Sequence, residues 1–76
     1  MRICQVQLKA IGEIREFVKA ASNFEGAVDM VSGRYVIDAK SLLGVMTLDL
    51  SKPVELRVHG DHPEKFFKAI DSYLVA

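Results

Sequence analysis

The sequence predicts a small α+β domain in which helices cover one face of a mostly antiparallel sheet. Apolar and polar residues alternate with period two at residues 2–8 and again at residues 54–59, which is typical of strands. Apolar residues recur at helical spacing over residues 11–22 and after Pro63. A short connection containing Gly33 joins two segments rich in β-forming residues, as in a hairpin. The predicted order is β-α-β-β-α-β-α.

The first strand is followed closely by the first helix. Over residues 2–8 the alternation places four side chains on one face: Arg2, Cys4, Val6 and Leu8. Residues 11–22 form an amphipathic helix with an apolar stripe and a charged face. The stripe consists of Ile11, Ile14, Phe17, Val18 and Ala21, and the other face carries Glu13, Arg15, Glu16 and Lys19. Residues 23–26 break this pattern and end the helix.

The middle of the chain is predicted to form a hairpin and then a short helix. Residues 27–31 and 35–38 are the two hairpin strands. Residues 41–49 form the helix, which Gly44 weakens by about 1 kcal/mol relative to alanine. A turn at residues 51–53 leads into the next strand.

The last strand and the last helix complete the predicted core. Residues 54–59 alternate apolar and polar side chains, so that Val54, Leu56 and Val58 share one face. Pro63 fits the first turn of the final helix, where its missing N–H costs nothing. The buried stripe of that helix consists of Phe66, Phe67, Ile70, Tyr73 and Leu74.

Length and charge narrow the classes of function. The 76 residues suffice for one domain, which we expect to span residues 1–76, and 50% of them are apolar, so a core is available. Ten basic side chains balance ten acidic ones. This neutrality argues against a nucleic acid or a membrane surface as partner, because both usually require a basic excess.

The chain offers little for covalent or metal chemistry. Cys4 is the only cysteine, so neither a disulfide nor a cysteine-rich metal cluster can form within the chain, and we expect Cys4 to be a buried structural residue. Asp38 and Asp49 lack metal-ligand spacing, so no metal or cofactor is expected. No signal-peptide core is present, and no apolar run approaches the ~20 residues of a membrane span. We expect a cytoplasmic protein.

The most informative segment is Lys40-Ser41-Leu42-Leu43-Gly44-Val45-Met46-Thr47-Leu48. Ser41 is placed to cap the helix that follows, which is worth about 1 kcal/mol. A helix start also offers free N–H groups and partial positive charge, which favour an anion such as phosphate. Leu42, Leu43 and Met46 cannot all point inward from so short a helix. Either two are buried and one is incidentally exposed, or they form an apolar docking patch.

This segment closely resembles the regulatory-serine segment of HPr, the small phosphocarrier of the bacterial sugar phosphotransferase system. Residues 18–24 resemble the end of the first helix of that family, and the similarity runs from about Val18 to Leu74. The resemblance implies an open-faced β-sandwich, with a four-stranded antiparallel sheet under three helices. It also implies that Ser41 is a regulatory phosphorylation site beside Lys40. Leu42, Leu43 and Met46 would then contact protein partners.

One departure from the family pattern concerns the phosphate-accepting histidine. HPr carries it on the loop between the first strand and the first helix, in a pattern close to Gly-Ile-His-Ala-Arg-Pro. An ungapped count back from the matched helix end puts Ala10 at the histidine position, Gly12 at the arginine and Glu13 at the proline. A methyl group cannot accept a phosphoryl group, and Glu13 would repel one. We therefore predict a member without histidine phosphocarrier activity, no catalytic residue and no enzyme.

The two histidines of the chain are not expected to replace the missing one. His59 and His62 lie at the end of the fourth strand and in the turn that follows. In the fold implied by the resemblance, that end of the sheet is on the order of 20 Å from Ala10, the length of one strand. We expect His59 to be a solvated strand residue and His62 to lie at the start of the last helix.

Three functions remain open. The chain could be a regulatory, protein-binding HPr-like domain, whose partners are an HPr-kinase-like enzyme or a transcriptional regulator. It could instead be an HPr-fold assembly module unrelated to sugar uptake, for instance a homo-oligomer, since fold does not fix function. An active phosphocarrier with an unexpected acceptor is the weakest of the three, because the loop offers no nucleophile and no charge-stabilising donor.

Overall fold

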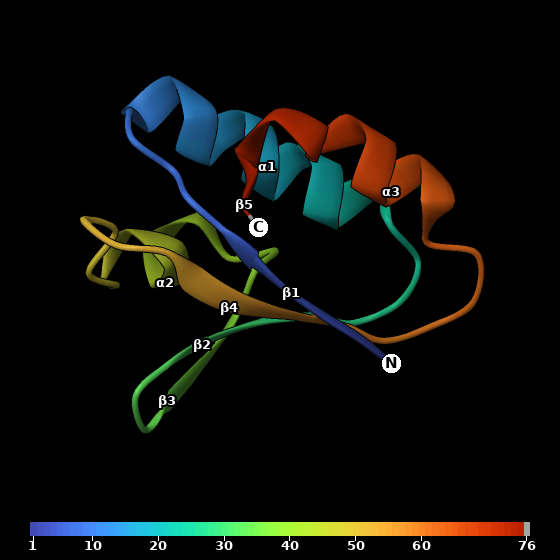
Figure 1. Cartoon of the computed structure of the whole chain (residues 1–76), viewed down its shortest axis with the longest axis horizontal. Helices are drawn as coiled ribbons and strands as arrows, with labels where there is room; N and C mark the ends of the chain where they lie inside the picture. Colours follow the sequence, from blue (N-terminus) through green and yellow to red (C-terminus); the bar gives the residue numbers. More distant parts are fainter. Residues whose placement is uncertain (76) are drawn as a thin grey trace.

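The structure is a computed structural model that describes residues 1–75, and it confirms the predicted α+β class. Its elements are β1 (Arg2–Val6), α1 (Ile11–Asn23), β2 (Val28–Ser32), β3 (Tyr35–Asp38), α2 (Leu42–Met46), β4 (Val54–Val58), α3 (Glu64–Ala69), a 3₁₀ turn (Asp71–Tyr73) and β5 (Leu74–Val75). Figure 1 shows α1 and α3 together on one side of the sheet, with α2 at one end of the molecule. α2 contacts both α1 and β3.

The strands of residues 1–75 form one antiparallel sheet in the order β3-β2-β4-β1-β5. Leu56 of β4 pairs with Cys4 on one side and with Met30 on the other, and Met30 in turn pairs with Ile37. Because paired residues point to the same face, this row of side chains faces the helices. The register therefore puts this apolar row on the side of the sheet that the helices cover.

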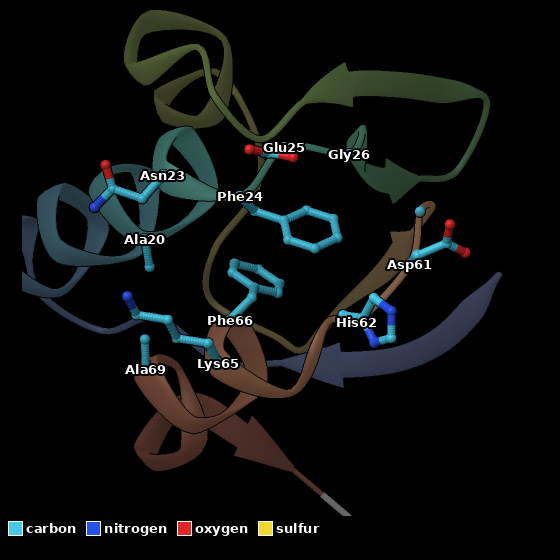
Figure 2. Close-up of a pocket in the computed structure, with 11 residues that line it drawn as sticks. Ala20, Asn23, Phe24, Glu25, Gly26, Asp61, His62, Lys65, Phe66 and Ala69 are labelled. Atoms are coloured by element: carbon cyan, nitrogen blue, oxygen red, sulfur yellow. The ribbon is translucent and has the colours of Figure 1, made fainter.

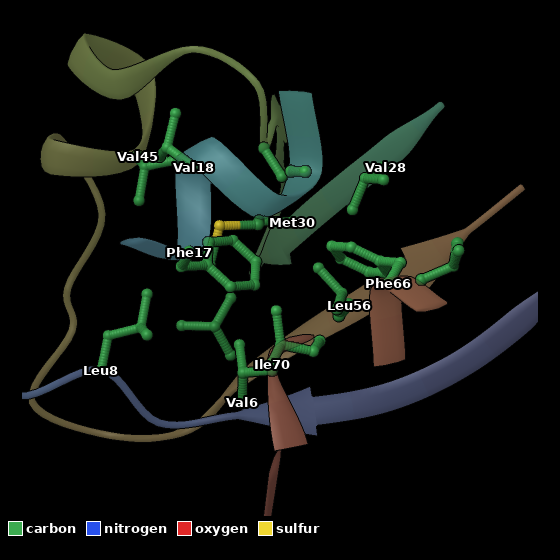
Figure 3. Packing of buried hydrophobic residues seen from close by; sticks show 14 residues of the cluster. Val6, Leu8, Phe17, Val18, Val28, Met30, Val45, Leu56, Phe66 and Ile70 are labelled. Atoms are coloured by element: carbon green, nitrogen blue, oxygen red, sulfur yellow. The ribbon is translucent and has the colours of Figure 1, made fainter. Parts of the chain in front are cut away.

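The core fills the space between the sheet and the helices. Phe17 of α1 is fully buried, and Figure 3 shows it beside Met30 from the sheet. Buried α1 residues include Val18 and Ala21, which confirms the centre of the predicted stripe. Its first residue is an exception, because Ile11 is 54% exposed. The start of α1 therefore presents an apolar side chain to solvent.

The C-terminal part differs from the sequence prediction. α3 ends at Ala69, so Tyr73 and Leu74 do not belong to a helical stripe. Instead Leu74 and Val75 form β5, which pairs with β1 as a fifth strand. The main-chain N–H of Gln7 also donates to the carbonyl of Tyr73 at 2.9 Å. These bonds cover backbone groups that the edge of β1 would otherwise leave unpaired, which explains why the chain leaves the helix early.

β1 and α2 are also shorter than predicted. β1 ends at Val6 although the alternation continues to Leu8, and Leu8 is nevertheless buried in the core. α2 occupies only Leu42–Met46 of the predicted residues 41–49. Thr47 is its C-cap, and the hydroxyl of Thr47 donates to the carbonyl of Gly44 at 2.6 Å. This side-chain bond satisfies a carbonyl at the end of the helix.

Candidate functional site

Ser41 lies at the start of α2, where the sequence predicts it. Its backbone is extended, with φ of −98° and ψ of 106°, and its hydroxyl oxygen accepts from the N–H of Gly44 at 3.2 Å. The preceding turn fixes this position, because the carbonyl of Asp38 accepts from the N–H of Ser41 at 2.9 Å. The Ser41 side chain is exposed. It combines the geometry of a helix cap with access for a modifying enzyme.

The Lys40 side chain is bound at the end of α1, although Lys40 directly precedes Ser41 in the sequence. Its ammonium donates to the main-chain carbonyl of Phe24 at 2.8 Å. Phe24 is the C-cap residue of α1, and the last turn of that helix has no basic residue. A lysine at this place complements the negative end of the helix dipole. The Lys40 ammonium is thus already engaged at the end of α1.

The apolar residues of α2 divide into a buried and an exposed set. Val45 is fully buried and Leu42 is half-buried, so these two anchor the helix. Leu43 is 79% exposed and Met46 is 46% exposed. We call Leu43, Met46 and the exposed Ile11 at the start of α1 the apolar patch. Figure 1 shows α2 and the start of α1 at the same end of the molecule.

The loop before α1 carries no nucleophilic side chain at residue 10. Ala10 is the N-cap of α1, with an extended backbone and no side-chain bond to the helix. A side chain added at Gly12 would meet no atom within 4 Å, so this position faces open space. Glu13 turns back on the loop, where its carboxylate accepts from the N–H of Lys9 at 2.8 Å. The Glu13 carboxylate is thus bonded to the loop that precedes its own helix.

Both histidines lie away from Ala10 and the start of α1. Antiparallel pairing of Arg2 with Val58 brings the end of β4 beside the start of β1, as expected for this fold. His59 is half-buried rather than fully solvated, and its Nε2 lies 3.2 Å from Oδ2 of Asp29. His62 is exposed and lines a cavity at the C-terminal end of α1, the end opposite to Ala10.

Two titratable side chains have shifted pKa values, and neither indicates a reactive site. Burial raises the pKa of the half-buried Cys4 thiol, which suppresses the nucleophilic thiolate. Hydrogen bonds from the hydroxyl and the N–H of Ser51 lower the pKa of the exposed Asp49 carboxyl. In residues 1–75 no three His, Cys, Asp or Glu side chains are grouped as metal ligands. None of the helices in those residues has the length and apolar character of a membrane span.

Sequence reasoning missed one feature, a cavity of about 700 Å³ between the end of α1 and the start of α3. Its walls come from residues 20–26 and residues 60–69, which are distant in sequence (Figure 2). The only available signal was the pair of turns at Gly26 and Gly60.

Comparisons with known proteins agree on one family. A family model described as "PTS HPr component phosphorylation site" matches residues 13–75, a range that includes Ser41 and begins after Ala10. A search of curated protein sequences finds no match. Among solved structures, the chain is similar to a crystal structure described as HPr-C-His from Thermoanaerobacter tengcongensis. The TM-score is 0.78 at 26% sequence identity, and the match covers 95% of this chain and 89% of that chain.

Proposed function

The chain belongs to the HPr family of the sugar phosphotransferase system, and we propose that it acts there as a regulatory, protein-binding member rather than as a histidine phosphocarrier. HPr proteins are small carriers rather than enzymes, and the proposal places this chain in the cytoplasm, without a cofactor of its own. Its partners would be proteins of the same system, for which an HPr-kinase-like enzyme and a transcriptional regulator are the candidates.

The observation that carries this proposal is the identity of the residue at the start of α1. Ala10 caps the helix with a methyl group, which has no lone pair to attack a phosphorus atom. Phosphoryl transfer also requires donors that stabilise the developing negative charge. Gly12 supplies no side-chain donor, and the carboxylate of Glu13 adds negative charge to the same loop.

Ser41 is the proposed control point. A phosphate on its hydroxyl would lie at the N-terminus of α2, where the helix dipole favours negative charge. The exposed side chain leaves room for the group, and the cap bond to Gly44 can be taken over by a phosphate oxygen. The Lys40 ammonium already donates to the carbonyl of Phe24, so a phosphate on Ser41 that attracted Lys40 would compete with a bond at the end of α1.

The apolar patch is the proposed docking surface. Leu43, Met46 and Ile11 expose large apolar side chains next to Ser41 in sequence or on the helix that α2 contacts. Methionine adapts its shape to different partners, which suits a surface that meets more than one protein. A negative charge introduced at Ser41 would then border this surface and change its affinity.

Incubation with enzyme I and phosphoenolpyruvate tests the absence of carrier activity. We expect no acid-labile phosphate on the protein, whereas a histidine-containing HPr in the same reaction becomes labelled. Substantial acid-labile labelling of this chain would overturn the proposal. If label appeared, His59→Ala and His62→Ala variants would identify the acceptor.

Incubation with the HPr serine kinase and ATP tests the regulatory site. We expect an acid-stable phosphate on the wild type and none on Ser41→Ala. Ser22→Ala is the matched control, because Ser22 is an exposed serine on α1 outside the apolar patch. A wild-type protein that stays unlabelled would remove Ser41 from the proposal.

Binding measurements with the same kinase test the docking surface. Leu43→Glu should weaken binding strongly, because it puts a charge on the most exposed residue of the patch. Val36→Glu is the control, since Val36 is 61% exposed and lies on the sheet face turned away from the helices. Equal affinities of the two variants would contradict docking through the patch.

Assembly is the second candidate, because the sheet face turned away from the helices is partly apolar. Ile3 and Val36 lie on that face and are 56% and 61% exposed. Homo-oligomers commonly bury such side chains in their interfaces. Sedimentation equilibrium distinguishes the two functions, since an oligomer that Ile3→Lys dissociates supports assembly and a strict monomer excludes it.

A further inference from the structure

β3 is an open edge of the sheet. The strand order β3-β2-β4-β1-β5 leaves β3 paired with β2 on one side only. Figure 1 shows the hairpin of β2 and β3 extending away from α1 and α3. The edge side chains Tyr35 and Val36 are 65% and 61% exposed. The opposite edge, β5, has two described residues, whereas β3 has four, so β3 is the longer free edge within residues 1–75.

The hairpin determines which backbone groups point outward from this edge. A two-residue turn at Gly33 and Arg34 joins the strands, and Gly33 has φ of 59°. Beyond the other end of β3, the N–H of Ala39 donates to the carbonyl of Val28 at 2.8 Å. Because bonded and non-bonded pairs alternate along an antiparallel ladder, the N–H and C=O of Val36 point away from β2. Within residues 1–75 neither group has a hydrogen-bond partner.

This edge lacks most of the devices that keep a sheet from pairing with another chain. Such edges are commonly protected by lysine, proline or a bulge. β3 contains neither lysine nor proline, and its register with β2 is continuous over four pairs, so it has no bulge. α2 packs on the helix side of β3 rather than along its edge, since a Cβ at Gly44 would lie 2.8 Å from Cγ2 of Ile37. A further strand therefore has access to the edge.

The two ends of the edge carry opposite charges. Arg34 precedes β3 and Asp38 ends it, both are exposed, and neither forms an ion pair within residues 1–75. If two copies pair antiparallel about Val36, Arg34 of each copy lies opposite Asp38 of the other. Opposite charges directly across two strands stabilise a sheet, and like charges destabilise it. A pairing centred on Arg34 or on Asp38 would bring like charges together, so the charges select the register centred on Val36.

We propose that β3 binds β3 of a second copy of this chain, antiparallel and about a twofold axis at Val36. The two Val36 residues exchange both of their main-chain hydrogen bonds. Tyr35 lies opposite Ile37 of the other copy, an aromatic and β-branched pair of the kind that stabilises sheets. The two five-stranded sheets become continuous, and every contact occurs twice, as in other isologous dimers.

This dimer is independent of the regulatory role proposed for Ser41, and it does not use the sheet face around Ile3. The contact is short, because the carbonyl of Asp38 already accepts from the N–H of Ser41 at 2.9 Å. A four-residue edge buries less than the roughly 1,200 Å² at which stable specific interfaces begin. We therefore expect a reversible dimer that forms at protein concentrations on the order of 0.1 mM and above.

Sedimentation equilibrium of the full chain between about 10 μM and about 1 mM tests the proposal. We expect a monomer–dimer equilibrium. Hydrogen exchange followed by NMR locates the contact. The exchange of the Val36 N–H should slow as the concentration rises. The N–H of Ala39 is the control, because it is bonded to Val28 within the chain and its exchange should not depend on concentration.

Charge variants test the register. Arg34→Asp and Asp38→Arg should each weaken the dimer about tenfold or more, because each puts like charges opposite each other at two symmetry-related places. An equimolar mixture of these two variants should form a heterodimer with an affinity within about threefold of the wild type, since opposite charges face each other again at both ends. Arg15→Asp is the matched control, because Arg15 is exposed on α1, and it should leave the dimer unchanged.

Variants at Val36 test the backbone bonds. Val36→Pro removes an N–H that points outward, which an edge strand tolerates, so the monomer should fold while the dimer is lost. Val36→Thr keeps the N–H and the branched shape and should retain the dimer. Ile3→Lys should also retain it, because Ile3 lies on β1, which β2 and β4 separate from β3. Circular dichroism of each variant keeps loss of folding apart from loss of pairing.

Three results would overturn the proposal. One is a strict monomer at about 1 mM, which would leave the proposed role of Ser41 untouched. Another is an oligomer that Ile3→Lys dissociates and Arg34→Asp does not, since that oligomer would use the sheet face instead of the edge. The third is failure of the two folded charge variants to form a heterodimer, which would exclude the register centred on Val36.

Discussion

The ammonium of Lys40 donates a 2.8 Å hydrogen bond to the carbonyl of Phe24. This bond connects the residue that precedes Ser41 to the C-cap of α1, so it links the proposed regulatory segment to the end of the longest helix in the described residues. Phe24 also lines the cavity between the end of α1 and the start of α3. A negative charge at Ser41 that attracts Lys40 would therefore weaken the hydrogen bond at the end of α1.

Replacing Lys40 by methionine tests the structural role of this bond. Methionine keeps an apolar stem of similar length but removes the charged donor, so we expect the free energy of unfolding to fall by about 1–2 kcal/mol. Urea denaturation followed by circular dichroism measures it. Lys19→Met is the control, because Lys19 is exposed on the charged face of α1, and it should change stability by less than about 0.5 kcal/mol. Equal effects of the two variants would show that the bond from Lys40 to Phe24 does not stabilise the fold.

Replacing Gly44 by alanine should destabilise the protein, although alanine is the better helix former. A Cβ at Gly44 would lie 2.8 Å from Cγ2 of Ile37, so α2 can approach β3 only because this side chain is missing. Overpacking typically costs about 1–3 kcal/mol and should exceed the gain of about 1 kcal/mol in helix propensity, leaving a net loss of up to about 2 kcal/mol. Thermal unfolding measures the change.

Gly12→Ala is the control for this prediction. Gly12 is also helical, but a Cβ there would meet nothing within 4 Å. We expect this variant to gain up to about 1 kcal/mol from helix propensity alone. The two glycine variants should therefore have opposite signs. A stabilised Gly44→Ala variant would mean that α2 and β3 are not held as closely as the structure has them.

Ser41 can be tested as a helix cap independently of its phosphorylation. Ser41→Ala removes the oxygen that accepts from Gly44, which should cost about 1 kcal/mol. Ser41→Asp keeps an acceptor at the same place and adds charge at the start of α2, so it should retain the wild-type stability within about 0.5 kcal/mol. For a domain of this size, the alanine variant should melt about 4–8 °C lower. Equal melting temperatures of all three proteins would contradict a capping role.

Cys4 gives a prediction for pH dependence. Burial raises the pKa of its thiol above the ordinary value of 9.0, so the folded protein should hold less thiolate than the unfolded chain as the pH rises through that value. Iodoacetamide should therefore alkylate the folded protein more slowly than the urea-unfolded chain at the same alkaline pH. The associated stability is complete below pH 9.0 and is lost as the pH rises through the raised pKa of the folded state. A Cys4→Ser variant should lack this loss.

The sequence predicted those parts of the fold that depend on local periodicity. The alternation around Val6 and Leu56 and the helical stripe around Phe17 each have one period and one buried face, so the elements could be located. The C-terminus could not, because Tyr73 and Leu74 continue the spacing of the α3 stripe. Pairing with β1 decides their conformation, and such pairing is a tertiary effect that local spacing does not contain.

In the candidate site, too, local features could be predicted from the sequence and tertiary contacts could not. The position of Ser41 at the start of α2 follows from a local signal, a capping residue before an apolar segment. The bond of Lys40 to Phe24 does not, since it depends on how α1 and α2 meet. The cavity is likewise built from turns at Gly26 and Gly60 that are remote in sequence. Local sequence signals predicted where single residues such as Ser41 lie in their elements. Contacts between elements that are distant in sequence are seen only in the structure.

Restoring a nucleophile to the loop before α1 is the most direct test of why carrier activity should be absent. Ala10 is exposed and makes no side-chain bond, so Ala10→His should fold without loss of stability. The single variant should accept little phosphate from enzyme I, because the carboxylate of Glu13 remains on the loop and repels the incoming group. Adding Gly12→Arg and Glu13→Gln supplies a charge-stabilising donor and removes the repulsion. We therefore expect acid-labile labelling to rise from the single to the triple variant. Labelling that stays at the wild-type level in the folded triple variant would show that the loop differs from an HPr carrier in more than these side chains.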